Sequence, residues 1–395
     1  MAENEVRMNS KERMKITFSH KEPDRVPTGE IEIDEPIATK ILGHEAWMGY
    51  GGHHRGKRAN EMAKQGRMDE YYTREAEDKV ALVQKLELDF LPILPHGTVF
   101  TPPEILSENV WRYGDPKSED WSIWQFQPES DMYSEIDSAL VHLGLPGFER
   151  LVERMEANKP SVDGLDFTQV DWVVKEIGRD IFLVGNVDVY FGMHMAASSV
   201  LFEAVAARPD LMDRYLDCQM AFALLFVEAQ AKHHVDAFLG GEDWAGKNGP
   251  MISPKHFCRY ILPRMQLLVQ KCHELGLPFI KHTDGNITRI EQELLVESGI
   301  DAYQAIEPVA GMDIVDLKQR FGSQLTLMGN IDCGRLLCDG TPEEVKQETR
   351  RVIEAVAPGG GFVLTSSNSI HRGVKLENYL AMLETVRKYG VYPIR

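Results

Sequence analysis

The chain alternates short apolar runs with long amphipathic segments, and this alternation constrains its fold more than any other feature. Eight runs have the length and composition of buried strands. They cover residues 26–33, 90–94, 181–184, 235–239, 278–282, 302–306, 325–328 and 362–365. Helical periodicity fills most of the intervals, at 210–234, 254–275, 287–298, 315–321, 342–357 and 376–389. Strand followed by helix, repeated to a count of eight, predicts an α/β protein with a (β/α)8 TIM barrel rather than an open sheet.

Residues 34–180 depart from the simple repeat. Two runs within them, 108–114 and 121–126, carry aromatic side chains and predict a small hairpin. Segments this long in a compact domain usually cover a site or add structure beside it. We therefore expect one barrel domain over residues 1–395, with the inserted segments forming a cap over the barrel mouth. An N-terminal helical subdomain without a catalytic part is the alternative.

Composition and charge exclude several classes of protein. The formal net charge of −18 would repel nucleic acid and anionic membrane surfaces. No stretch approaches the roughly 20 apolar residues of a membrane helix, and residues 1–15 lack the apolar core of a signal peptide. We therefore expect a cytoplasmic protein. The five cysteines contain no Cys-x-x-Cys pair, which predicts neither a disulfide framework nor a zinc ribbon.

The segment 279–286 contains the clearest candidate for chemistry. It is a short apolar run that ends in His282 and Asp284. Side chains two residues apart in a strand point to the same face, so this imidazole and carboxylate should project together from the carboxyl end of the strand. Such a pair can bind a metal, perform acid/base catalysis or hold a polar substrate.

Polar residues also follow the other predicted strands, at the end of a barrel where functional side chains gather. They are Glu30, Glu32, Asn186, Asp188, Glu242, Asp243, Glu307, Asn330, Asp332, Ser366, Ser367 and Asn368. This mixture of carboxylates, amides and one imidazole suits a metal or a polar ligand better than a hydrophobic one.

Several motifs resemble the uroporphyrinogen decarboxylase superfamily, over nearly the whole chain. They are Ser10-Lys11-Glu12-Arg13, Lys21-Glu22-Pro23-Asp24-Arg25-Val26-Pro27, Gly241-Glu242-Asp243-Trp244, Pro250-Met251-Ile252-Ser253-Pro254, His282-Thr283-Asp284-Gly285-Asn286, Gly329-Asn330-Ile331-Asp332 and Pro358-Gly359-Gly360-Gly361-Phe362. More narrowly, they resemble the decarboxylase-like branch that includes the corrinoid-dependent methyltransferases of anaerobic bacteria and archaea. The resemblance implies a (β/α)8 barrel, in agreement with the strand count.

Two departures narrow what the resemblance implies. The early Arg-Gln-Ala-Gly-Arg motif of true uroporphyrinogen decarboxylases is replaced by the acidic segment 30–35, which should repel a substrate with many carboxylates. In the thiol-methylating branch, zinc is typically held by His-x-Cys and a later Cys. Here Asp284 stands in the place of the first Cys, and residues 365–368 contain no Cys.

An imidazole with carboxylates remains an acceptable catalytic zinc set, and its oxygen-rich shell favours Lewis-acid action on an ether or hydroxyl oxygen. The resemblance then implies a methyltransferase, an O-demethylase that moves a methyl group from a small methoxylated or methylated donor to a cobalt corrinoid (cobalamin). The chain lacks an Asp-x-His-x-x-Gly corrinoid-binding sequence, so a partner protein would carry the corrinoid. A monomer or homodimer is expected.

Roles follow for the candidate residues. His282, Asp284 and Glu242 are the expected metal ligands; His282, Asp332 and Glu242 are the expected catalytic residues; Asn186, Asp188, Tyr190, Trp244 and Asn330 are the expected substrate-binding residues.

Two other functions stay open. The first is a metal-independent decarboxylase acting on a small acid, with Asp332 or Asp188 as the proton donor. The second is a non-catalytic sensor that keeps an inherited barrel. A cluster of ionisable groups at the strand ends speaks against the sensor, because burying charges without a use is costly.

Overall fold

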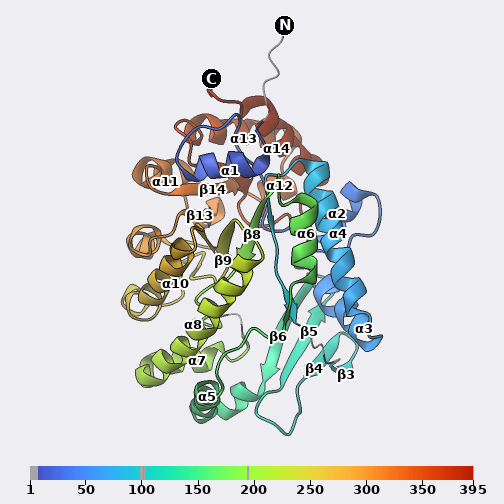
Figure 1. Cartoon of the computed structure of the whole chain (residues 1–395), viewed down its shortest axis with the longest axis vertical. Helices are drawn as coiled ribbons and strands as arrows, with labels where there is room; N and C mark the ends of the chain where they lie inside the picture. The colour runs from blue at the N-terminus through green and yellow to red at the C-terminus, as the bar shows by residue number, and fades with distance from the viewer. Residues whose placement is uncertain (1–7, 98–100, 102, 194, 395) are drawn as a thin grey trace.

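The computed structural model describes residues 8–97, 101, 103–193 and 195–394 (Figure 1). Its central feature is a curled, seven-stranded sheet in the order β1-β8-β9-β12-β13-β14-β15, in which all neighbours are parallel. The strands are β1 (Phe90–Pro92), β8 (Phe182–Asn186), β9 (Ala237–Gly240), β12 (Phe279–Thr283), β13 (Ala302–Ala305), β14 (Thr326–Ile331) and β15 (Phe362–Ser366). Each matches a predicted strand, so these seven predictions are confirmed.

The remaining predicted strand, 26–33, fills the eighth position of the barrel without forming a continuous ladder. On one side it makes parallel bridges to β15 and the loop after it, through Thr28 to Leu364 and Ile33 to Ile370. On the other side the backbone N–H of Asp89, just before β1, donates to the carbonyl of Thr28 at 2.7 Å. The segment thus joins the two edges of the sheet and closes the barrel.

Side chains from all eight positions fill the barrel interior. The inner cluster consists of Ile31, Phe90, Phe182, Val184, Ala237, Leu239, Ile280, Ala302, Met328 and Val363, with Met14 below them. A second, larger cluster lies between the strands and the surrounding helices. Because successive side chains of a strand face opposite ways, this pattern fixes which residues point into the barrel.

The helices surround the sheet on its outer side (Figure 1). They are α1 (Ser10–Phe18), α2 (Glu35–Leu42), α3 (Ala59–Lys64), α4 (Met68–Leu86), α5 (Ala139–Ala157), α6 (Thr168–Ile177), α7 (Ser198–Ala207), α8 (Pro209–Lys232), α9 (Pro254–His256), α10 (Leu262–Glu274), α11 (Ile314–Phe321), α12 (Leu336–Asp339), α13 (Pro342–Val356) and α14 (Leu376–Tyr389). Shorter helical turns are η1 (His53–Arg58), η2 (Phe257–Ile261), η3 (Thr288–Ile290), η4 (Glu293–Glu297) and η5 (Pro308–Ala310).

The helix predictions agree with these bounds at four of the six positions. The expected helix at 254–275 is divided into α9, η2 and α10, and the expected helix at 287–298 is broken into η3 and η4. The predicted start of α13 is confirmed in atomic detail. Thr341 accepts a hydrogen bond from the backbone of Glu344, whose side chain bonds back to Thr341. Within the described residues, no helix is both long and apolar enough to cross a membrane.

The inserted segments form a separate antiparallel sheet of β3 (Glu104–Ser107), β4 (Val110–Tyr113), β5 (Ser122–Gln127) and β6 (Met132–Ser138). The predicted hairpin is its centre, with Trp111 opposite Trp124. The guanidinium of Arg372, in the loop after β15, donates to the carbonyl of Pro128 at 3.2 Å. This sheet therefore lies beside the carboxyl ends of the barrel strands, far from α1 and α14 (Figure 1). The remaining strands are the pairs β2 (His96–Gly97) with β7 (Leu165–Asp166), and β10 (Ala245–Gly246) with β11 (Gly249–Pro250).

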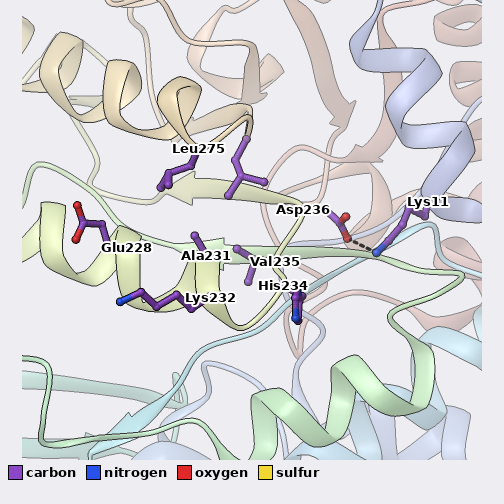
Figure 2. Close-up of a pocket in the computed structure, with 9 residues that line it drawn as sticks. Lys11, Glu228, Ala231, Lys232, His234, Val235, Asp236 and Leu275 are labelled. Carbon is purple, nitrogen blue, oxygen red and sulfur yellow. Dashed lines mark ion pairs between the residues drawn. The ribbon is translucent and has the colours of Figure 1, made fainter.

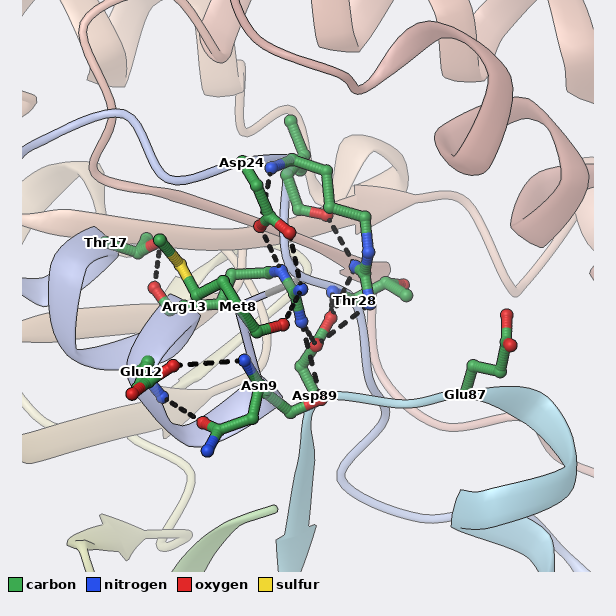
Figure 3. A network of polar contacts seen from close by, with 12 residues as sticks. Met8, Asn9, Glu12, Arg13, Thr17, Asp24, Thr28, Glu87 and Asp89 are labelled. Atoms are coloured by element: carbon green, nitrogen blue, oxygen red, sulfur yellow. Dashed lines mark hydrogen bonds and ion pairs between the residues drawn. The ribbon is translucent and has the colours of Figure 1, made fainter. Parts of the chain in front are cut away.

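A buried network of charges ties α1 and the segment 24–28 to the start of β1 (Figure 3). Asp89 is fully buried and accepts hydrogen bonds from Arg13 at 2.6 Å, from Arg25 at 2.7 Å and from the backbone N–H of Thr28 at 2.7 Å. Arg13 also donates to both carboxylate oxygens of Asp24. One carboxylate thus holds the amino-terminal segment in the position where it closes the barrel.

We expect Asp89→Asn to destabilise the protein by about 3–5 kcal/mol, because it leaves two guanidinium groups facing a neutral amide. The measurement is the free energy of unfolding by chemical denaturation. Glu354→Gln is the matched control, since it breaks the exposed ion pair with Arg350 and should cost less than about 1 kcal/mol. Equal, small losses in both variants would contradict the assigned role of Asp89.

Candidate functional site

His282 and Asp284 point into the barrel because they lie two and four residues after Ile280, whose side chain faces the interior. Ile280 belongs to the inner cluster, and residues two and four positions later share its orientation. His282 is 7% exposed, and Asp284 is half-buried just beyond the end of β12. The predicted pairing of this imidazole and carboxylate is present, with Nε2 of His282 lying 3.5 Å from Oδ1 of Asp284.

A second carboxylate comes from Asp243, in the loop that follows the neighbouring strand, β9. Leu239 of β9 faces the barrel interior, and Asp243 is four residues further along. Oδ1 of Asp243 lies 3.7 Å from Nε2 of His282 and accepts the backbone N–H of Asp284 at 2.9 Å. In the described part of the chain, these three residues form the group whose ligand atoms all lie within 4.8 Å of one another.

The surroundings hold this group in place but leave one oxygen unsatisfied. Nδ1 of His282 is hydrogen-bonded to Oε1 of Gln304, and Asn368 donates to Oδ2 of Asp284 at 2.6 Å. Oδ1 of Asp284 is buried without a hydrogen-bond partner among the described residues. Burial raises the pKa of Asp284 to about 6, although His282 lowers it. An acceptor left in this state is a position where a cation would bind.

Glu242, an expected metal ligand, lies outside the group. Its Oε1 accepts the backbone N–H groups of Gly192 and Met193 at 2.9 and 3.0 Å, in the loop after β8. Burial raises the pKa of this carboxyl above its usual value. Both residues lie beyond the end of β9 at Gly240, and the loop there turns their adjacent side chains toward different partners, Glu242 to the loop after β8 and Asp243 to Asp284. Asp243 takes the place expected for Glu242.

Asp188 is bound within the protein rather than free for substrate. It forms an ion pair with Lys281, which is fully buried, and accepts the backbone N–H of Glu242 at 2.7 Å. Lys281 also donates to the carbonyl of Glu242 at 2.7 Å. Asp188 and Lys281 therefore hold the carboxyl ends of β8, β9 and β12 together, which makes Asp188 a poor choice of proton donor.

The other expected substrate-binding residues differ in accessibility. Tyr190 is 44% exposed, and the side-chain amide of Asn186 lies beside Gly241 at the end of β9. Trp244 is fully buried and packs edge-on against Phe191 and Phe257. The prediction that Trp244 contacts substrate is therefore wrong, since its ring belongs to the layer between strands and helices.

Asn330 and Asp332 lie where the sequence places them, at the end of β14. Both are buried and share the inward orientation of Met328. The amide of Asn330 donates to the carbonyl of Ile306 at 3.2 Å. Oδ1 of Asp332 accepts the N–H groups of the turn that follows, from Gly334 at 2.9 Å and from Arg335 at 3.0 Å.

The acidic segment 30–35 is less charged than the sequence suggests. Glu30 is buried, and burial raises its pKa to about 8; it accepts the hydroxyl of Ser366 at 2.6 Å. Burial raises the pKa of Glu32 to about 7, although Lys79 lowers it. Glu30 is thus largely protonated at neutral pH. Repulsion of polycarboxylate substrates by this segment is therefore weaker than expected.

Sequence reasoning missed Asp243 as a ligand and Gln304 altogether. Asp243 could have been found by counting from Leu239, had the inward face of β9 been known. Gln304 lies inside the predicted strand 302–306, and a single amide in a strand does not by itself indicate a functional residue. Cys333 is buried near the same end of the barrel, with its N–H donating to Ser367, and is not part of the group.

A cavity of about 590 Å³ lies at the opposite end of the barrel (Figure 2). It is lined by residues that precede β9 and β12, and Lys11 forms an ion pair with Asp236 at its edge at 2.9 Å. Figure 2 shows these side chains around an open depression. In barrels of this kind the amino-terminal face mainly carries stability, so the candidate site is the one at the carboxyl ends.

The model of the family "Uroporphyrinogen decarboxylase (URO-D)" matches residues 168–389, more than half of the chain. The chain belongs to the uroporphyrinogen decarboxylase family. The uroporphyrinogen decarboxylase of Pseudoalteromonas translucida is 25% identical over 270 residues, which cover 62% of this chain and 72% of that protein. The enzyme of Shewanella loihica is 24% identical over 260 residues, with 62% and 71% covered.

Among solved structures, a methyltransferase from Methanosarcina mazei superposes with a TM-score of 0.63 at 16% identity, over 97% of this chain and 99% of that one. At this identity the match shows the fold. The family's barrel, with the inserted segments included, therefore accounts for nearly the whole chain.

The raised pKa of Glu30 predicts how stability depends on pH. Between its ordinary pKa of 4.5 and about 8 the folded protein binds more protons at this carboxyl than the unfolded chain does, so stability falls as pH rises. The side chain of Glu30→Gln cannot ionise, so between pH 4.5 and 8 this variant should lose less unfolding free energy than the wild type. The difference should be roughly 1.4 kcal/mol for each unit by which the pKa of Glu30 differs between the folded and unfolded states. The measurement is the unfolding free energy at several pH values. Exposed Glu77→Gln is the control, and parallel curves for Glu30→Gln and wild type would refute the assignment.

Proposed function

We propose that this protein is a zinc-assisted, corrinoid-dependent methyltransferase that demethylates a small methoxylated or methylated donor. The observation that carries the proposal is the group formed by Asp243, His282 and Asp284 at the carboxyl ends of β9 and β12. Full-length similarity in fold to the Methanosarcina mazei methyltransferase supports the choice of reaction.

The donor set fits a catalytic zinc ion. One imidazole nitrogen and two carboxylate oxygens supply three ligands, and such sites keep a fourth position for water or substrate. Two carboxylates also balance the charge of a divalent cation. The buried oxygen of Asp284 that lacks a partner is the acceptor such an ion would satisfy. When bound, the ion supplies Lewis-acid polarisation of the donor's ether oxygen.

The chain's own residues bind and orient the donor. Tyr190 and Asn186, from the loop after β8 and the end of that strand, lie on the side of the mouth next to Asp243. Asn330 and Asp332 contribute polar groups from β14, on the other side. Glu242 fixes the loop 192–193 that follows Tyr190. When the methyl group leaves, the oxygen that keeps the bonding electron pair takes up a proton from solvent at the barrel mouth.

The methyl acceptor is a cobalt corrinoid carried by a separate protein. Two observations support this part of the proposal: residues 1–395 contain no Asp-x-His-x-x-Gly sequence, and the candidate metal group lies at the carboxyl ends of the strands. In this proposal the partner presents its cofactor at the barrel mouth.

Zinc binding should depend on Asp243 rather than on Glu242. We expect near-stoichiometric zinc in the wild-type protein. We expect Asp243→Ala, His282→Ala and Asp284→Ala to weaken binding by more than the roughly 10–100-fold that loss of a supporting hydrogen bond costs. Glu242→Gln is the control and should bind zinc like the wild type. The measurements are elemental analysis and calorimetric titration with Zn²⁺; a wild type that stays metal-free after zinc addition would overturn the proposal.

Methyl transfer itself is tested with free cob(I)alamin and a panel of methoxylated arenes and alkyl methyl ethers. The expected result is formation of methylcobalamin, seen by its absorption spectrum, together with the demethylated alcohol or phenol. Activity should vanish in His282→Ala and persist in the exposed variant Glu77→Gln. Turnover that survives complete removal of zinc would exclude the metal-assisted route.

A metal-independent decarboxylase is the second candidate, and the names of the curated relatives favour it. With Asp188 held in its ion pair, Asp332 is the better of the two proton donors considered. Release of carbon dioxide from small acids by the zinc-free protein, lost in Asp332→Asn, would support this function instead.

A further inference from the structure

Gln304 is a buried amide at the level of the barrel where the inward side chains change from apolar to polar, in register with His282. It lies on β13, is fully buried, and is two residues beyond Ala302 of the inner cluster. An amide in such a position requires partners for both its oxygen and its nitrogen. One partner is His282 of the candidate metal group, and the other is Asn368, which is hydrogen-bonded to Asp284 of that group.

The orientation of the Gln304 amide follows from its second partner. Its Nε2 donates to the backbone carbonyl of Asn368 at 3.5 Å, and a carbonyl can only accept. Oε1 therefore faces His282 and must accept a hydrogen bond from Nδ1. The proton of a neutral imidazole is then on Nδ1, and Nε2 carries a lone pair directed at Asp243 and Asp284.

Asn368 completes the arrangement from the loop after β15. Its side-chain amide donates to Oδ2 of Asp284 at 2.6 Å, which leaves Oδ1 as the free oxygen of that carboxylate. Hydrogen bonds thus run from His282 through Gln304 and Asn368 to Asp284, which lies two residues from His282. The hydrogen bonds engage Nδ1 of His282 and Oδ2 of Asp284, so Nε2 and Oδ1 stay available as metal ligands.

We propose that Gln304 and Asn368 are positioning residues that preset the site for a divalent metal before the metal arrives. Gln304 fixes the tautomer of His282 so that Nε2 is the ligand atom, and Asn368 fixes Asp284 so that Oδ1 is. The inference rests on the proposed function for the identity of the metal. It goes beyond that function by naming the residues that determine the site's geometry and affinity.

The tautomer can be measured without catalysis. Nitrogen NMR of zinc-loaded protein labelled at histidine shows which ring nitrogen carries the proton and which binds the metal, and His282→Ala identifies the signal. In the zinc-loaded wild type we expect the proton on Nδ1 and the metal on Nε2.

Three variants separate positioning from simple destabilisation. Gln304→Leu keeps the volume but removes both hydrogen bonds, and should mix the tautomers and weaken zinc binding roughly 10–100-fold. Gln304→Glu still accepts the proton of Nδ1 but cannot donate to the carbonyl of Asn368, so it should restore the tautomer and only part of the affinity. Asn368→Ala should weaken zinc binding over a similar range without changing the tautomer. Gln324→Leu, at an exposed position, is the control for loss of an amide.

The outcomes separate this proposal from the proposed function. Wild-type zinc affinity in Gln304→Leu, with an unchanged histidine signal, would overturn the positioning role while leaving the zinc site intact. A wild type that binds no divalent metal would overturn the zinc-assisted function. If the His282 signal of that metal-free protein still changed in Gln304→Leu, the positioning role of Gln304 would be supported on its own.

Discussion

The two-residue alternation of side chains in a closed ring of parallel strands governs this structure. Ile280 and His282 share one face of β12, and Asp243 reaches His282 from the loop just beyond β9. Lower in the barrel this face buries apolar groups, and near the carboxyl ends it carries polar ones. Closure of the ring makes these polar residues converge, because each strand contributes its end to the same opening.

Burial of so many polar groups is tolerated because nearly every one has a partner. Lys281 is paired with Asp188, Glu242 accepts two backbone N–H groups, and Glu30 is bonded to Ser366. These arrangements hold the strand ends and loops in register. Twelve buried side-chain atoms of the described residues lack a hydrogen-bond partner, and Oδ1 of Asp284 is the one that belongs to the candidate metal group. It differs from the others because an imidazole and a second carboxylate lie beside it.

Periodicity was enough to find all eight barrel positions, since the apolar runs and the amphipathic segments alternate regularly. It could not show that the segment 26–33 would pair with β15 through isolated bridges only. Between these bridges the backbone N–H of Ser366 donates to the side-chain carboxylate of Glu30 instead of to a backbone carbonyl. Strand phase was the harder problem. Without knowing which face of β9 is inward, adjacent acids such as Glu242 and Asp243 cannot be told apart. Contacts across strands, such as Gln304 with His282, depend on register that one sequence does not encode locally.

The segment that closes the barrel has a consequence for the order in which the protein can form. The position between β15 and β1 is filled by residues 26–33, which lie more than 300 residues before β15 in sequence. Strands β1 to β14 can assemble on one another as they are synthesised, but the amino-terminal segment must wait for β15 as its second neighbour. Asn368, which supports Asp284, also emerges only at that stage. The ring and its polar centre are therefore completed together, late in synthesis, and until then the nascent chain exposes an unpaired sheet edge, which is a site of aggregation.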